Sequence, residues 1–250
     1  YRIGYSPSNG LRKTLRAKGF SDNDMLLAGV VRKSDRDGTL YDYFRNRVMF
    51  PIENRQGKVI AFGARSIGEA QPKYLNSGDG PTFSKKTVLY GLVQAREGLR
   101  RKLPLVVGEG YMDVIAIQRS GTAAAVAPLG TALTEEQIAL LWKLHDEPIL
   151  CFDGDAAGQR AQMRALERIL PLLTPGKSAR LAVMPEGKDP DDVLRETGND
   201  GFLKLLAVAR SLVDSLWDAL VGQHDLRQPE SRSRFCQENR GQVRLIGNNP

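Results

Sequence analysis

The chain has 250 residues, of which 41% are hydrophobic and 26% charged, as is typical of a globular protein with one large or two modest domains. It has no run of about 18 apolar residues and no signal peptide, and its two cysteines and two histidines exclude a disulfide framework and a zinc site, so we expect a cytoplasmic protein without a membrane segment. The net charge of +7 is unevenly distributed: residues 1–102 carry 20 basic and 9 acidic residues, and the remainder 16 and 20.

The basic amino-terminal part, residues 1–102, has the mixed pattern of an α+β subdomain. Two β-rich segments flank Asn54–Gly57, a turn sequence, and this predicts a hairpin. Ser21 is a suitable N-cap for a helix that reaches Ala28. The other expected elements are a helix over 11–18, strands over 47–52 and 58–63, a loop over 72–84 and a helix over 92–102.

From residue 103 the pattern changes to strands that alternate with helices. Connections this short predict a mainly parallel sheet with helices on its faces. Thr134 and Gln137 form a capping box at the start of one helix. The expected strands cover 103–107, 122–127, 148–152 and 179–184, and the expected helices 111–120, 134–144 and 158–170. Residues 198–250 read as a helical part, with Leu203 and Trp217 in its apolar stripe.

Six carboxylates lie on three short segments that each follow an apolar strand. They are Glu109 and Asp113, Asp153 and Asp155, and Asp189 and Asp191. The carboxyl ends of parallel strands meet at one edge of a sheet, so we expect the three segments to lie together. Carboxylates grouped in this way repel one another unless a hard cation such as Mg²⁺ is bound, so the pattern predicts metal-assisted chemistry at phosphate.

Some of these residues have simpler interpretations. A carboxylate after a strand, such as Glu109, is often a solvated loop residue, although its glycine neighbours favour presentation at a sheet edge. Asp191 follows Pro190 and fits the first turn of a helix. Arg160, Arg164 and Arg168 are spaced on one helix face, which we interpret as exposed surface.

The ordered set of motifs resembles a known family. Glu109–Val114, with the sequence EGYMDV, and the later Asp153-Gly154-Asp155 resemble the Toprim domain. The segments 47–52, 72–77 and 89–92, together with Asp189-Pro190-Asp191, are similar to the RNA-polymerase core of bacterial DnaG-type primases. The resemblance covers residues 1–197. At Ser77–Pro81 the chain departs from the family, which more often has proline and glutamate after the serine, and this leaves the geometry of that loop open.

The resemblance implies a nucleotidyltransferase that makes short RNA primers on single-stranded DNA from ribonucleoside triphosphates. It implies that Asp153 and Asp155 are the principal ligands of Mg²⁺, for which Mn²⁺ can substitute, and that Glu109 is a further ligand or the general base. Asp189 and Asp191 would complete the metal site, and Asp113 would support it. The implied nucleotide and nucleic-acid contacts are Arg45, Arg47, Arg65, Lys73, Asn76 and Lys85.

The same resemblance implies a division of labour and a set of partners. Residues 1–102 would bind template and nucleotide, 103–197 would be the Toprim catalytic domain, and 198–250 would be an incomplete helical subdomain. Such primases also carry a zinc-binding domain and a helicase-binding domain, so we expect the replicative helicase and the zinc domain to act through regions absent from this chain. The expected location is the replication fork in the cytoplasm.

Two other functions remain open at this point. Asp153-x-Asp155 after a strand is also typical of phosphatases of the haloacid dehalogenase type, but these usually have Thr or Val where this chain has Ala157. A non-catalytic Toprim protein of recombination or repair would bind nucleic acid without keeping every acidic residue.

Overall fold

The computed structural model describes residues 1–130 and 132–246. The chain forms two compact units, Tyr1–Val93 and Gln94–Pro250. The three-part division expected from the sequence remains a prediction, and residues 247–250 of its third part lie outside the described residues.

An antiparallel sheet of four strands forms the centre of the first unit, in the order β1-β4-β5-β6. Its strands are β1 (Gly4–Ser6), β4 (Arg47–Glu53), β5 (Val59–Ser66) and β6 (Tyr74–Asn76). The predicted hairpin is confirmed as β4 and β5, and Gly57 in its turn has a φ of 79°, which glycine adopts without strain. The region predicted as a loop over 72–84 is corrected, because Tyr74–Asn76 pairs with β5.

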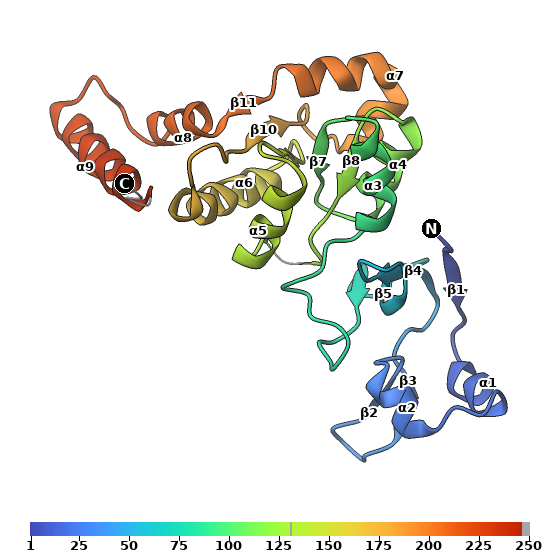
Figure 1. Cartoon of the computed structure of the whole chain (residues 1–250). Coiled ribbons are helices and arrows are strands. Elements are labelled where there is room, and N and C mark those ends of the chain that lie inside the picture. Colours follow the sequence, from blue (N-terminus) through green and yellow to red (C-terminus); the bar gives the residue numbers. More distant parts are fainter. Residues whose placement is uncertain (131, 247–250) are drawn as a thin grey trace. The chain divides into compact units, whose positions relative to one another are not determined.

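Short helices and a second, two-stranded sheet complete the first unit (Figure 1). They are α1 (Leu11–Ala17), α2 (Asp22–Leu27), β2 (Val31–Lys33) and β3 (Leu40–Asp42). Ser21 caps α2 as predicted, since its hydroxyl accepts the Asp24 N–H. Phe44 is fully buried and meets the Phe62 ring edge to face, which ties this layer to the four-stranded sheet.

The second unit is built on a five-stranded sheet in the order β11-β10-β9-β7-β8. Its strands are β7 (Leu105–Val107), β8 (Ala124–Val126), β9 (Ile149–Phe152), β10 (Arg180–Val183) and β11 (Arg210–Ser211). The pairs β7–β8, β7–β9 and β9–β10 are parallel, and only the edge strand β11 runs antiparallel among the described strands of this sheet. Strands β7, β8 and β9 are buried along their whole length, as strands of a sheet covered on both faces are.

Helices flank this sheet on both sides: α5 and α6 lie on one side, and α4 packs against α7 on the other (Figure 1). The helices are α3 (Leu92–Arg100), α4 (Tyr111–Ser120), α5 (Glu135–Leu144), α6 (Ala156–Ile169), α7 (Pro190–Ala207), α8 (Leu212–Val221) and α9 (Pro229–Leu245), with a 3₁₀ turn η1 (Leu170–Leu172) after α6. The predicted capping box at Thr134 and Gln137 is present. The predicted fold class is therefore confirmed: an α+β amino-terminal part, a mainly parallel sheet with helices, and helices at the carboxyl end.

Two details of the carboxyl-terminal part differ from the expectation. The chain after residue 201 is not helical throughout, because Arg210–Ser211 adds a short strand to β10. Leu203 and Trp217 are exposed rather than buried in an apolar stripe. Trp217 still meets Phe235 edge to face, which joins α8 to α9. Across residues 1–130 and 132–246, the helices are all too short or too polar to cross a membrane.

Candidate metal centre and nucleic-acid interface

The first acidic segment is fixed by the start of α4. Asp113 lies on the first turn of this helix, and its Oδ2 accepts the backbone N–H groups of Glu109 at 3.1 Å and Gly110 at 2.8 Å. The carboxylate thus closes the turn between β7 and α4 and is itself buried. The pKa of Asp113 is raised to about 6, mainly by burial and also by the charges of Asp189 and Glu109, while the two N–H bonds act in the opposite direction.

The second acidic segment, at the end of β9, is tied directly to the first. The backbone N–H of Asp153 donates to Glu109 Oε1 at 2.9 Å. Asp155 is the N-cap of α6, and its Oδ1 accepts the N–H groups of Ala157 and Gly158 at 2.8 and 2.7 Å. The predicted start of this helix at Gly158 is thus corrected to Ala156, because Asp155 supplies the cap.

The third acidic segment reaches the second through glycine. The Gly154 N–H donates to the Lys188 carbonyl at 3.0 Å, and the Gly187 N–H donates to the Gly154 carbonyl at 3.1 Å. A Cβ atom on Gly154 would lie 1.9 Å from the Pro185 carbonyl oxygen, so no other residue fits this approach. These two bonds bring Asp189, the N-cap of α7, beside the Asp-Gly-Asp segment. Gly154 is not among the site residues predicted from the sequence, although its position between two aspartates was an available signal.

Asp153 lies at the electrostatic centre of five carboxylates that we call the acidic group: Glu109, Asp113, Asp153, Asp155 and Asp189. The pKa of Asp153 is raised to about 7, first by burial and then by the neighbouring charges of Glu109, Asp113, Asp189 and Asp155. Its Oδ1 is buried and has no hydrogen-bond partner. An unpartnered buried carboxylate oxygen surrounded by other carboxylates is the donor chemistry that a hard cation requires.

Asp191 has an arginine as its neighbour, and the role of metal ligand expected of it stays a prediction. It lies on the first turn of α7, 4.0 Å from Arg195, as its simpler interpretation predicted. Across the described ranges 1–130 and 132–246, no three His, Cys, Asp or Glu side chains are placed so that they could hold a metal ion. One oxygen each of Glu109, Asp113, Asp155 and Asp189 is bonded to a backbone N–H. The residues therefore fit a cation in chemistry, and a complete ligand set requires their carboxylates to rotate toward Asp153.

The three arginines of α6 have different surroundings. Arg160 is exposed, as expected. Arg168 is used structurally, because its Nη1 donates to the Leu133 carbonyl at 2.7 Å. All three arginines are exposed, as expected, and Arg164 also lines a cavity of about 290 Å³ together with Glu109.

The basic residues of the first unit fall into two groups. Arg47 is buried, and its Nη1 donates to the carbonyls of Pro72 and Lys73 at 2.9 and 3.3 Å. Its guanidinium thus has a role within the fold, and the phosphate contact expected of it stays a prediction. Arg65 and Lys73 line an open cavity of about 800 Å³, and Arg45 is exposed, with its guanidinium 5.5 Å from the centre of the Tyr41 ring.

The remaining predicted contacts lie on β6 and in the following loop. The Asn76 carbonyl accepts the Tyr43 hydroxyl at 3.3 Å, which holds β6 against the segment that follows β3. The Lys85 N–H donates to Asp79 Oδ1 at 2.8 Å, and this bond closes the loop in which the sequence departs from the family pattern. Both side chains stay predicted nucleotide or nucleic-acid contacts.

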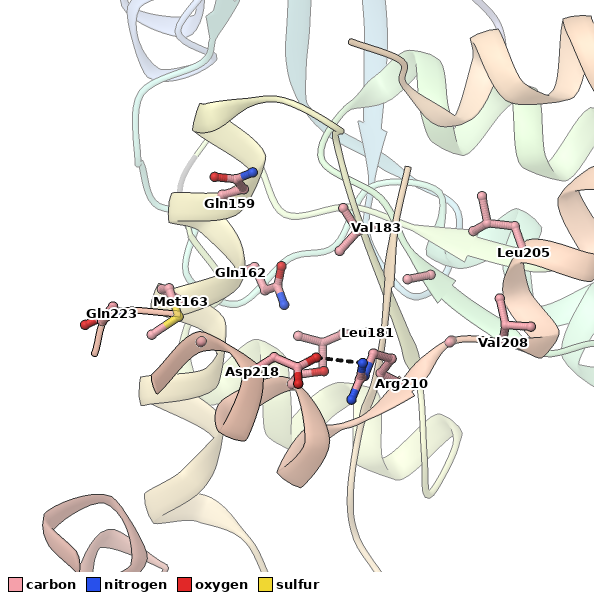
Figure 2. A pocket seen from close by; sticks show the side chains of 14 residues that line it. Gln159, Gln162, Met163, Leu181, Val183, Leu205, Val208, Arg210, Asp218 and Gln223 are labelled. Atoms are coloured by element: carbon pink, nitrogen blue, oxygen red, sulfur yellow. Dashed lines mark ion pairs between the residues drawn. The ribbon is translucent and has the colours of Figure 1, made fainter. Parts of the chain in front are cut away.

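A further cavity in the second unit contains none of the predicted site residues. It has a volume of about 490 Å³ and lies between α6, β10 and α8 (Figure 2). Leu181 and Val183 contribute apolar surface, and two further lining residues, Arg210 and Asp218, form an ion pair at 2.7 Å. Without a carboxylate of the acidic group, it offers no continuation of that site.

Each of the two units matches the model of a known protein family. Residues 1–96 match the model of the DNA primase catalytic core, N-terminal domain, and residues 106–194 match the Toprim-like model. The chain is 42% identical to the DNA primase of Pseudomonas aeruginosa and 41% identical to that of Escherichia coli strain K12. These alignments cover 94% of the chain but 36% and 41% of those proteins, so the chain spans about two fifths of the length of these curated relatives.

Solved structures agree with this assignment. A DNA primase domain from Pseudomonas aeruginosa superposes with a TM-score of 0.90 at 40% identity, covering 99% of this chain and 78% of that one. The Escherichia coli primase catalytic core superposes with a TM-score of 0.83 at 36% identity, covering 99% and 86%. With both domain models matched in order and most of these solved cores covered, the chain belongs to the DnaG-type family of bacterial DNA primases and corresponds to its catalytic core, which contains a Toprim domain.

Proposed function

We propose that this chain is the catalytic core of a DNA primase, a DNA-directed RNA polymerase that extends short RNA primers on single-stranded DNA. The observation that carries this proposal is the convergence of carboxylates from three strand ends on Asp153, in a chain of the primase family. Relatives support the choice of substrate. A DnaG catalytic domain 38% identical to this chain was solved bound to single-stranded DNA, and that of Mycobacterium tuberculosis in complex with double-stranded DNA.

The Toprim domain implies a divalent metal site, and we propose Mg²⁺ as its ion, with Mn²⁺ as a substitute. Asp153 would hold it through the unpartnered Oδ1, with Asp155 and Asp189 as further ligands. A bound cation would stabilise the charge that develops on the phosphate oxygens during nucleotidyl transfer. Glu109 would serve as a ligand or as the base that accepts the proton of the primer 3′ hydroxyl. Asp113 keeps the Glu109 backbone in place from the helix side.

We assign the binding of template and nucleotide to the first 102 residues, with Arg45, Arg65, Lys73, Asn76 and Lys85 as contacts. Arg65 and Lys73 carry positive charge at one cavity, and exposed cations of this kind bind backbone phosphates without sequence preference. Residues 103–197 would perform the chemistry, with ribonucleoside triphosphates as substrates and an RNA primer as product. Coupling to the replicative helicase and to a zinc-binding domain would use regions outside this chain.

A primer-extension assay tests the proposal. The chain is mixed with an RNA primer annealed to a DNA template, labelled ribonucleotides and Mg²⁺ or Mn²⁺, so that initiation is not required. The expected product is extended RNA from the wild type and from Asp146→Asn, whose exposed carboxylate pairs with Lys177 away from the acidic group, and none from Asp153→Asn. DNA binding without extension would favour a non-catalytic Toprim protein, and phosphate release from simple phosphate esters would favour a phosphatase. Either result overturns the proposal.

A further inference from the structure

Four residues lie opposite one another across the amino-terminal sheet. Tyr5 of β1 pairs with Val48 of β4, Val48 pairs with Arg65 of β5, and Arg65 pairs with Tyr74 of β6. Directly paired residues point to the same face of a sheet. The register therefore makes one row of side chains with a tyrosine at each end and an arginine between them, which we call the tyrosine row.

The tyrosine row lies where this face of the sheet is open. Tyr5 is 56% exposed and Tyr74 is 41% exposed. Further along β4 on the same face, Phe50 and Ile52 are 2% and 0% exposed. The protein thus covers one end of the face with its own core and presents the other, with two large rings, to solvent.

Positive charge adjoins the two rings. Arg65 lines the cavity of about 800 Å³ together with Lys73, and Glu69 is the acidic residue of its lining. The Nε of Arg65 is buried and has no hydrogen-bond acceptor, which is costly unless a ligand supplies one. The Lys73 backbone is held rigidly, because its carbonyl accepts both the Ser66 N–H at 2.9 Å and the Arg47 guanidinium.

We propose that the tyrosine row is a base-stacking platform for single-stranded DNA. The rings of Tyr5 and Tyr74 take the faces of bases, and Arg65 and Lys73 take the phosphates between them. Every base has a π-face, so stacking suits a protein that must accept any template sequence. This inference rests on the proposed function and adds to it a contribution to binding that does not depend on charge.

The platform is built before DNA arrives. The Tyr5 hydroxyl donates to Asn46 Oδ1 at 2.8 Å, which fixes the direction of its ring. Tyr5 and Tyr74 are three inter-strand spacings apart, roughly 14 Å. Stacked nucleotides are separated by about 3.4 Å along a strand, so the two rings engage bases several nucleotides apart rather than neighbours. An oligonucleotide of two residues can reach only one ring.

Fluorescence anisotropy of labelled oligo(dT) of about 12 nucleotides, measured over a range of salt concentrations, tests the inference. Tyr5→Leu and Tyr74→Leu should each weaken binding by about 5-fold or more. They should leave the salt slope, which is the slope of log affinity against log salt concentration, unchanged, because stacking releases no counterions. Arg65→Ala should lower the slope by roughly 0.7. Tyr74→Trp should bind as well as the wild type, because it restores a ring. Phe20→Leu is the matched control, since this aromatic side chain is 51% exposed but lies off the sheet.

Oligonucleotide length provides a second readout. With two nucleotides, each single variant should keep most of the affinity, because the other ring is still available, and only the double variant should lose the stacking contribution. With 12 nucleotides, each single variant should already weaken binding. Melting curves of each variant confirm that the fold is kept. If the wild type binds DNA and both tyrosine variants bind with the same affinity, the platform is overturned. A changed salt slope in these variants would also overturn it. Either result leaves the primase proposal standing. No binding of DNA by the wild type would overturn the proposed function itself.

Discussion

The backbone N–H of Asp153 donates to Glu109 Oε1 at 2.9 Å, which links two residues 44 positions apart in the chain. The bond joins the carboxyl ends of β7 and β9, neighbouring parallel strands. It gives Glu109 a structural task next to its proposed chemical one. Substitutions that separate the shape of this side chain from its charge therefore distinguish the two roles.

Glu109→Gln keeps an oxygen acceptor for the Asp153 N–H but removes the negative charge. Primer extension should fall by at least about 100-fold while the melting temperature stays close to that of the wild type. Glu109→Ala should lose the same activity and also about 1–3 kcal/mol of stability, because the N–H loses its partner. Extension assays and thermal melts measure both quantities. Near-normal turnover in Glu109→Gln would return this residue to the class of structural loop carboxylates.

Asp153→Asn should stabilise the metal-free protein in a pH-dependent way. Its pKa of about 7 lies above the value of about 3.9 in an unfolded chain, so between these values the folded protein holds a proton that the unfolded chain has lost. Stability therefore falls as the pH rises through this window. Near pH 8 the free energy of unfolding of the variant should exceed that of the wild type by about 1 kcal/mol, a value that allows for the half-exposed carboxylate. Near pH 4 the two free energies should be equal.

Thermal melts in EDTA at both pH values measure this difference. Addition of Mg²⁺ near pH 8 should raise the melting temperature of the wild type and leave that of Asp153→Asn nearly unchanged, since ligand binding to the folded state is stabilising. Equal responses of the two proteins to Mg²⁺ would contradict the assignment of Asp153 as a ligand.

Gly154→Ala should destabilise the second unit by about 1–3 kcal/mol, because the new methyl group overlaps the Pro185 carbonyl. The strain would push the third acidic segment away from the second, so extension activity should fall as well. Gly241→Ala in α9 is the matched control: no neighbouring atom lies within 4 Å of the position that its new methyl group would take, and it should be neutral or stabilising by up to about 1 kcal/mol. Equal melting temperatures for the two variants would refute the role given to Gly154.

Arg45→Ala and Arg47→Ala should separate binding from folding. Arg45 is exposed, so its loss should weaken DNA binding, lower the salt slope by roughly 0.7 and leave stability unchanged. Arg47 holds the carbonyls of Pro72 and Lys73, so its loss should cost about 1–3 kcal/mol of stability. Anisotropy and thermal melts on the two variants provide the comparison. A reduced salt slope without destabilisation in Arg47→Ala would show that this side chain does reach phosphate.

The sequence by itself determined the elements and the order of the acidic segments. Periodicity and capping residues located α4 at Tyr111–Ser120 and the box at Thr134, because these signals act within one helical turn. Parallel-sheet topology then required Glu109, Asp153 and Asp189 to meet, since all three follow strands at the same edge. The alternation of strands and helices was sufficient to infer that these carboxylates lie together, and no interatomic distance was needed.

Only the tertiary structure decided how each side chain is used. Arg45 and Arg47 are two residues apart and alike in sequence, but the register of β4 buries one and the loop before it exposes the other. Arg164 lines one cavity with Glu109 because α6 packs against β9. The tyrosine row joins residues 5, 48, 65 and 74 through three strand pairings. Such contacts are set by long-range register and packing, for which a local pattern of residues carries no signal.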